Sequence, residues 1–465
     1  MPATAPHQTT SAVEHRTPTF APRATDAFTT AFEAYLWGYP LVLMERTRKL
    51  LTHREHRRGA PANTFQHRSK LATPRDREIV KPNNDTLYSS AWLDLSHGPL
   101  ILEVPDVDGR YYSFQFLDAY TNTWAYVGRR VTGTAASRHL IVGPQGHESL
   151  PGLPDLPVLK APTNTVWLLG RTIVDGEPDL EAATDLITRY RLTPVAGEGD
   201  AAAEWSTGPM PSPHDIGAAG ISFFDELGSA LLLNPPPASE TGLLDRFASL
   251  GIGPGLRPSE TADDLTRPAL EQAVRFADRL LEARESMRGG KATRGADGER
   301  GDKSGAARTG WSYDLDIGAY GQNYLLRALI ARHGLGALTA EEAVYASTRR
   351  DAAGHRLSGQ HAYRLHFPAD RLPPVAAFWS LTAYDQDNFL VENAIDRYAI
   401  GDRTPGLAHG DDGSLDILVQ HHEPAEGTSN WLPAPPGDFE LTLRFYQPRQ
   451  EMLQGRYVLP PIQRR

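Results

Sequence analysis

The sequence predicts a mainly β protein with an α-helical insert, in which two related β-sandwich, jelly-roll-like domains bracket a helical region. The 465 residues include 41 glycines and 37 prolines. Such a content favours many turns and short strands over a helical bundle. Short β-rich runs fill two separate stretches of the chain, and the two stretches repeat the same order of motifs. One unit used twice explains that repeat.

The chain opens with residues 1–25, which are polar and proline-rich and lack the apolar core of a signal peptide. We expect a disordered tail and a cytoplasmic location. A helix capped by Thr25 or Asp26 should follow, because aromatic and aliphatic residues recur at helical spacing. Pro40 predicts a kink or break near Tyr39. The spaced residues are Phe28, Phe32, Tyr35, Leu36 and Tyr39.

The remaining domains follow from changes in pattern. Between residues 83 and 175, short β-rich runs alternate with turn residues, so residues 26–178 form the first sandwich with its helix. Residues 179–350 are mainly helical, and residues 289–310 are glycine-rich, charged and free of large apolar side chains. We expect a mobile surface loop there. The β pattern returns in residues 351–465, the second sandwich.

The repeat can be read directly from two strand motifs. Residues 109–118 (GRYYSFQFLD) match residues 377–385 (AFWSLTAYD), and each is followed by an Asn-containing stretch and a Tyr–Gly–Arg-type segment. An Asn and a Trp then recur at 163–167 and 429–431. Coincidence between aromatic-rich strands is the alternative to duplication.

These segments resemble a bacterial family that carries domains of unknown function 1254 and 1214 in tandem. The amino-terminal resemblance rests on residues 81–88 (KPNNDTLY), 111–128 and 223–237; the carboxy-terminal one rests on 372–385, 430–435 and the closing LRFYQP and YVLPPI. The resemblance implies two β-sandwich domains around a helical region and implies no reaction. Many relatives carry export signals, and this chain departs from them there.

The first candidate site is the polar segment at residues 81–88, at the start of a strand. Lys81, Asp85 and Tyr88 are candidates for proton transfer, and Asn83 and Asn84 for substrate binding. An Asx turn needs only one or two such residues, so the density of polar groups favours a site on a rigid strand end. A turn that merely starts the strand is the alternative.

A second candidate lies at the end of the repeated strand, where Tyr384 and Asp385 could bind substrate through a hydroxyl and a carboxylate. A strand-end turn explains them equally well. Arg444 shares a strand face with Tyr446, and an inward-facing arginine would anchor an anionic group. An ordinary pair on the outside of the sheet is the alternative for Arg444.

The third candidate is Asn430 with Trp431, whose following prolines stiffen the segment. The indole could wall a pocket while the amide orients a ligand. A strand-entry loop packed on the core is the alternative. If the segment is functional, we expect it to meet residues 81–88 in a pocket closed by the helical insert.

Composition excludes several classes of function. The net charge is −10, so a nucleic-acid partner is not expected. No stretch approaches 18 apolar residues, so no membrane span is expected. The chain has no cysteine, and its histidines lack metal-ligand spacing, so no metal site is predicted. The phosphate-loop, dinucleotide and nucleophile-elbow motifs are absent, so no cofactor is evident.

Two functions remain open. The first is an enzyme that acts on a small polar or aromatic molecule by acid–base chemistry, of hydrolase, lyase or isomerase type, without a nucleotide cofactor. The second is a non-catalytic protein of paired β-sandwiches that binds a small-molecule ligand or serves in assembly, including as a homo-oligomer. An enclosed pocket with buried titratable groups favours the enzyme, and a shallow aromatic face favours the binding module.

Overall fold

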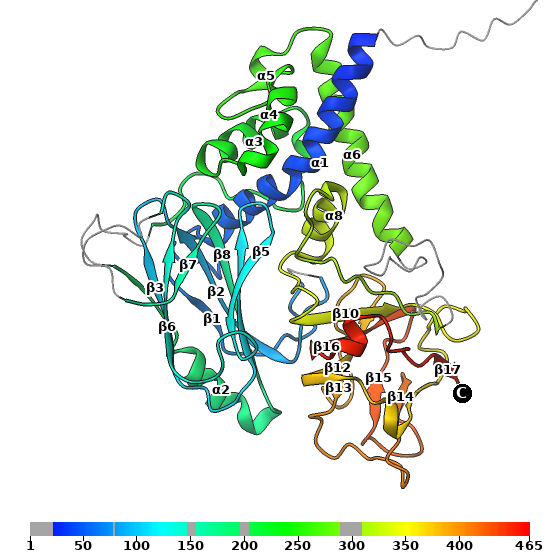
Figure 1. The fold of residues 1–465 in the computed structure, drawn as a ribbon. Helices are drawn as coiled ribbons and strands as arrows, with labels where there is room; N and C mark the ends of the chain where they lie inside the picture. Colours follow the sequence, from blue (N-terminus) through cyan, green and yellow to red (C-terminus); the bar gives the residue numbers. More distant parts are fainter. Residues whose placement is uncertain (1–21, 78–79, 147–154, 196–203, 289–308) are drawn as a thin grey trace, which may run out of the picture.

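The computed structural model describes residues 22–77, 80–146, 155–195, 204–288 and 309–465. The expected tail lies outside them except for residues 22–25, and the expected mobile loop lies outside them except for residues 309 and 310. The protein is mainly β, with several sheets and a helical region between two β units (Figure 1). We call these the N unit and the C unit.

The N unit has two sheets. The first is five-stranded, in the order β1-β2-β8-β4-β5, and the second is four-stranded, in the order β7-β6-β3-β9. A short helix, α2 (Leu180–Ile187), precedes the last strand. The strands are β1 (Gln66–Arg68), β2 (Thr86–Asp94), β3 (Leu100–Val104), β4 (Tyr112–Asp118), β5 (Thr123–Gly128), β6 (Ser137–Val142), β7 (Val158–Lys160), β8 (Thr165–Ile173) and β9 (Arg191–Pro194).

The C unit also has two sheets, each four-stranded, in the orders β10-β16-β12-β13 and β15-β14-β11-β17. A single turn of helix, α9 (Gln450–Leu453), follows β16. The strands are β10 (Ala343–Thr348), β11 (Tyr363–Phe367), β12 (Val375–Asp385), β13 (Ala399–Gly401), β14 (Leu415–Gln420), β15 (Trp431–Pro433), β16 (Phe439–Pro448) and β17 (Ile462–Arg464).

The two units have the same strand order. The order β2-β8-β4-β5 in the N unit corresponds to β10-β16-β12-β13 in the C unit, and β7-β6-β3 corresponds to β15-β14-β11. The strand directions agree as well. The pairs β6–β7 and β14–β15, which occupy equivalent places, are parallel, and the other pairs of named strands are antiparallel. Each strand of the C unit therefore has a counterpart in the N unit, from β10 and β2 through β17 and β9, and β1 is an additional strand of the N unit.

Alternate residues of each strand build the cores. In the N unit, Leu87 of β2 and Phe114 of β4 pack against Leu102 of β3 across one buried cluster. In the C unit, Leu381 of β12 packs in the same way with Ile417 of β14. Because successive side chains on a strand point to opposite faces, the remaining residues of the first sheets face outwards from these cores.

The helical region packs on one long helix, α1 (Pro22–Leu51), which runs through the middle of the other helices (Figure 1). Its core joins Trp37 of α1 to Phe223 and Leu270. The other helices are α3 (Ser222–Leu233), α4 (Thr241–Ala248), α5 (Pro258–Thr261), α6 (Thr266–Arg288) and α8 (Tyr324–Gly334).

Some expected boundaries differ from the structure. Thr25 and Asp26 lie inside α1, which already includes Pro22, so the expected cap there is wrong. Of the kink or break expected near Tyr39, the break does not occur, because α1 continues through Pro40 as one helix, and the helix bends along its length (Figure 1). Sheet membership extends the N unit to Pro194 and starts the C unit at Ala343. Within the described residues, no helix is both long and apolar enough to cross a membrane.

Candidate functional site

The outward face of the first C-unit sheet is polar, yet it is buried. On β16, Glu440, Thr442, Arg444 and Tyr446 alternate with apolar core residues, and every residue of the strand is buried. The polar face is covered by the N unit, because the hydroxyl of Tyr446 accepts a 2.8 Å hydrogen bond from Asn83 Nδ2. An alternating strand normally exposes its polar face, so a buried one marks a special interface.

Equivalent strands place the same three residue types side by side in both units. Arg171 on β8 is paired in register with Tyr88 on β2 and with Ser113 on β4. In the C unit, Arg444 on β16 is paired with Tyr345 on β10 and with Ser380 on β12. We call these the N row (Tyr88, Arg171, Ser113) and the C row (Tyr345, Arg444, Ser380).

The arginine of the N row has neutral hydrogen-bond partners. Arg171 is 5% exposed and donates to Gln115 Oε1 at 3.0 Å and to the carbonyl oxygen of Gly336 at 2.5 Å. Its guanidinium carbon lies 5.5 Å from the centre of the Tyr88 ring. Stacking on an aromatic ring and donation to amide oxygens fix the guanidinium without neutralising it.

The arginine of the C row is held in a similar way. Arg444 is 3% exposed and donates to Thr382 Oγ1 at 2.9 Å, to the hydroxyl of Tyr384 at 2.5 Å and to the carbonyl oxygen of Lys81 at 3.3 Å. In the part of the chain that the structure describes, neither Arg444 nor Arg171 has a carboxylate at hydrogen-bond or ion-pair distance. The hydrogen-bond acceptors of both guanidinium groups are therefore neutral, and Asp85 acts on Arg444 only from beyond ion-pair distance.

Tyrosines connect the two rows. Tyr345 and Tyr446 are each in electrostatic range of both guanidinium groups, and the ring of Tyr446 lies 5.5 Å from that of Tyr111 in the N unit. Burial raises the pKa of Tyr111, Tyr345 and Tyr446 above its usual value. Their hydroxyls are therefore neutral at physiological pH and can donate hydrogen bonds.

Solvent reaches the rows from one edge. Tyr88 and Ser90 on β2 are partly exposed, and so are their counterparts Tyr345 and Ser347 on β10. The other members of the two rows are buried. The arginines and serines of the rows are thus buried, and the two tyrosines are the partly exposed members, although the Tyr345 hydroxyl is itself buried and accepts a bond from the Leu338 amide.

The predicted site segment, residues 81–88, lies at this interface. Lys81 forms a close ion pair with Glu440, whose other oxygen accepts a 2.6 Å bond from Arg349. The Glu440 carboxylate is 4% exposed, and although burial opposes ionisation, the two cations hold its pKa below the usual value. Lys81 of the N unit thus forms an ion pair with Glu440 of the C unit.

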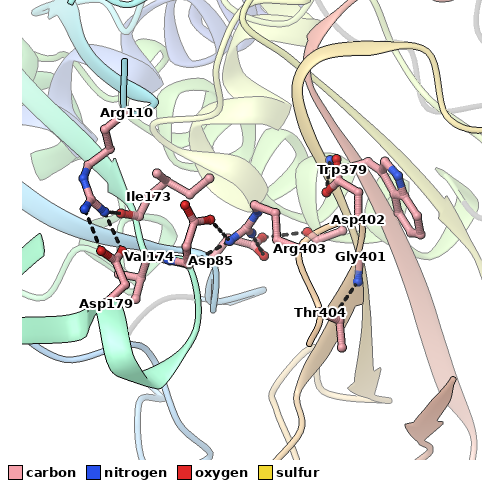
Figure 2. Close-up of polar contacts among 12 residues, drawn as sticks. Asp85, Arg110, Ile173, Val174, Asp179, Trp379, Gly401, Asp402, Arg403 and Thr404 are labelled. Atoms are coloured by element: carbon pink, nitrogen blue, oxygen red, sulfur yellow. Dashed lines mark hydrogen bonds and ion pairs between the residues drawn. The ribbon is translucent and has the colours of Figure 1, made fainter. Parts of the chain in front are cut away.

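Asp85 also contacts residues of the C unit at this interface. Its carboxylate accepts a 2.6 Å hydrogen bond from Ser380 Oγ and pairs with Arg403 at 3.1 Å (Figure 2). Arg403 also donates to the carbonyl oxygen of Val174, which fixes its guanidinium against the N unit. Asp85 therefore links the N unit to the serine of the C row.

The asparagines of the segment shape its backbone. Asn83 Oδ1 accepts a 2.6 Å bond from the Asp85 amide, which is the Asx turn that the sequence left open as an alternative. Asn84 donates to the carbonyl oxygen of Ala72. Both the turn and the contact with the C unit are present, and their roles in substrate binding stay predictions.

Tyr384 and Asp385 differ in their surroundings. Tyr384 is buried beside Arg444 and donates to the carbonyl oxygen of Pro82 at 2.9 Å. Asp385 Oδ1 accepts from the amides of Asp387 and Phe389, so this carboxylate closes the turn that ends β12. The structure thus brings Tyr384 to the C row and uses Asp385 in a turn.

Asn430 and Trp431 lie in the second C-unit sheet. Asn430 bonds to both the amide and the carbonyl of Ala408, and the Trp431 indole donates to the carbonyl oxygen of Gln420. In the described structure, no hydrogen bond or ion pair joins them to residues 81–88. A hollow of about 10 Å³ near Pro433 and a larger one of about 280 Å³ beside His366 include no residue of either row.

Sequence reasoning missed Arg171, Tyr345, Ser113 and Ser380. The signal for Arg171 was a single charged residue in the otherwise apolar strand at residues 165–173, which predicts a buried charge with a specific role. Tyr345 was missed because residues 343–348 had been assigned to the helical region. Among the described residues, no cluster of three or more His, Cys, Asp or Glu side chains could hold a metal ion.

Comparison with known families now identifies the class of protein. A family model described as a protein of unknown function (DUF1254) matches residues 62–194, and one described as a protein of unknown function (DUF1214) matches residues 342–450. The chain belongs to the family that carries these two domains in tandem, which confirms the resemblance seen in the sequence. The matched ranges fall within the N unit and the C unit.

Two solved structures align with the chain, and the first of them shows the same fold. The crystal structure of the VPA0106 protein from Vibrio parahaemolyticus aligns with a TM-score of 0.67 at 23% identity, covering 94% of this chain and all of that one. A putative uncharacterized protein from Burkholderia cenocepacia aligns with a TM-score of 0.45 at 12% identity, covering 95% of each chain. No curated protein matches the chain.

Proposed function

We propose that the chain binds a small molecule with an acidic group, held between the N row and the C row. The observation that carries the proposal is that Arg171 and Arg444 are buried and donate only to neutral hydrogen-bond acceptors, within the described residues, with Asp85 acting on Arg444 from beyond ion-pair distance. An unpaired buried charge costs several kcal/mol. A carboxylate or phosphate would supply the missing charge and match the planar guanidinium with paired hydrogen bonds.

The interface is locally positive at the two row arginines, whereas the whole protein is negatively charged. The chain carries a net charge of −10, yet its interface buries two arginines without carboxylate partners among the described residues. Neutral tyrosine hydroxyls and the rings of Phe378 and Tyr446, stacked 4.0 Å apart, complete the surroundings. Such a lining suits a small polar or aromatic acid.

An enzyme that acts on such a molecule by acid–base chemistry, without a nucleotide cofactor, is the second candidate. It is favoured by Tyr88, a partly exposed phenol whose ring lies against the Arg171 guanidinium. The other candidate groups are less suited to proton transfer, because Lys81 and Asp85 already have ion-pair partners. We therefore place binding first.

We further propose that each unit is a jelly-roll-like β-sandwich and that the two arose by duplication. The shared strand order supports both points. A matched turn supports duplication further: Asp118 and Asp385 each accept hydrogen bonds from the amides two and four residues later. Thr121 and Asn388 take the same left-handed conformation in these turns, with φ of 70° and 66°.

Thermal shift with small acids tests the binding proposal. At constant ionic strength, carboxylates such as benzoate should raise the unfolding temperature, while the matched amides should not. The response should weaken in Arg171→Met and in Arg444→Met, each of which keeps one of the two arginines, and persist unchanged in Arg138→Met, which removes an exposed arginine of β6. If all three variants respond like the parent, the rows are not the binding site.

To separate the two candidate functions, acids that raise the unfolding temperature can be incubated with the protein and followed by mass spectrometry. Binding without turnover is the outcome that we expect. Product formation that is lost in Tyr88→Phe, with binding retained, would establish the enzyme instead.

A further inference from the structure

We infer that the ligand carries two acidic groups, one for the arginine of each row. This inference rests on the proposed binding function and adds the class of ligand. It comes from the equivalence of the two rows: Arg171 and Arg444 occupy the same register position on equivalent strands, each between a tyrosine and a serine.

The two rows form one site because the units bring them together. Tyr111 of the N unit contacts Phe378 and Tyr446 of the C unit in a shared apolar cluster. Tyr345 and Tyr446 interact electrostatically with both Arg171 and Arg444. The two guanidinium groups therefore share one set of tyrosines.

The ion pairs at the interface involve neither of the two row arginines, among the described residues. Each of its three buried carboxylates has a cationic partner: Asp85 has Arg403, Glu342 has Arg130, and Glu440 has Lys81 and Arg349. The two buried arginines, Arg171 and Arg444, have no carboxylate at ion-pair distance among the described residues, and Asp85 acts on Arg444 only from farther away. Two negative charges on the ligand would balance them, whereas a single acid leaves one arginine unpaired.

The tyrosines and serines give each half of the site the same chemistry. Tyr88 and Tyr345 carry hydroxyls that can donate on one side of each arginine, and Ser113 carries one on the other side of Arg171. Ser380 is different, because its hydroxyl already donates to Asp85. The two halves therefore favour the same acidic group while binding it with unequal strength.

Isothermal titration with straight-chain dicarboxylates tests the inference. Malonate through suberate can be compared with the monocarboxylates of equal carbon number at fixed ionic strength. We expect the affinity to peak at one chain length and to exceed that of the matched monocarboxylate by about tenfold or more, because the second contact forms within the bound complex. Dicarboxylates that bind no better than monocarboxylates at every length would overturn the inference.

Variants that lack one arginine test the contribution of each row to ligand affinity. Arg171→Met and Arg444→Met should each lower the affinity for the best dicarboxylate to that of the monocarboxylate, and Arg138→Met should not change it. Near-ultraviolet circular dichroism checks that the variants stay folded, and Arg171→Lys and Arg444→Lys serve if methionine prevents folding. Unchanged dicarboxylate affinity in the folded variants also overturns the inference.

The outcomes separate this inference from the proposed function. If monocarboxylates and dicarboxylates bind equally and the arginine variants lose that binding, the anion site is retained. The inference that the ligand carries two acidic groups is then rejected. Absence of binding by every acid in the series rejects both.

Discussion

The N row and the C row occupy equivalent positions, but different segments hold their arginines. Arg171 reaches the carbonyl oxygen of Gly336, in the connection that leads from α8 to the C unit. Arg444 reaches the carbonyl oxygen of Lys81, in the N unit. Each arginine is thus fixed from outside its own unit, so the site is complete only when the two units are packed together.

The comparison also shows where the equivalence ends. Asp85 of the N unit binds Ser380 of the C row, whereas the hydroxyl of Ser113 in the N row accepts a bond from Tyr111. The only carboxylate in direct contact with either row, among the described residues, therefore comes from the predicted segment at residues 81–88. Substitutions in the two units can test how much of the interface depends on this asymmetry.

The largest effect is expected from Asp85→Ala. The change leaves Arg403 without its buried partner and Ser380 without its acceptor, and breaking such a pair costs about 3 kcal/mol. Urea denaturation followed by tryptophan fluorescence measures the loss. As a control, Asp416→Ala removes a carboxylate that is 39% exposed and should cost much less. Equal losses in the two variants would show that Asp85 does not hold the units together.

The matched turns give the next prediction. Asp118 accepts three hydrogen bonds from Tyr120 and Asn122 and is 6% exposed, whereas Asp385 accepts two amide bonds and its side chain is 21% exposed. Asp118→Ala should therefore cost about 2 kcal/mol and Asp385→Ala about 1 kcal/mol.

The same denaturation assay checks both turns. Asp118→Asn keeps the acceptor oxygen and should recover part of the loss. Equal costs for the two alanine variants would mean that burial does not distinguish the turns. A larger cost for Asp385→Ala would reverse the assignment of Asp385 as the more weakly held carboxylate.

The smallest effect concerns pH. The pKa of Glu440 is lowered in the folded protein, so its contribution to stability is present above the usual value of 4.5 and is lost as the pH falls below that value. Glu440→Gln should lower stability at pH 7 and flatten the decline below pH 4.5. Because Lys81 and Arg349 are 33% and 41% exposed, high salt should weaken the effect. An unchanged pH profile in the variant would remove Glu440 from the acid response.

The sequence predicted the mainly β fold and the tandem order of the units, because aromatic strands and turn residues carry local signals. It also singled out Asp85, Tyr384 and Arg444, which the structure brings together. The N row was not predicted, since register between strands distant in sequence places Tyr88 beside Arg171. An alternating strand such as β16 does not show from its own residues that another unit covers its polar face.

The position of a bound acid tests the anion site most directly. In a crystal grown with 4-bromobenzoate, anomalous scattering from bromine locates the ligand without bias from the protein density. We expect its carboxylate at about 3 Å from the guanidinium of Arg171 or Arg444. Bromine found only away from both rows, at concentrations that saturate the thermal shift, would contradict the proposed site.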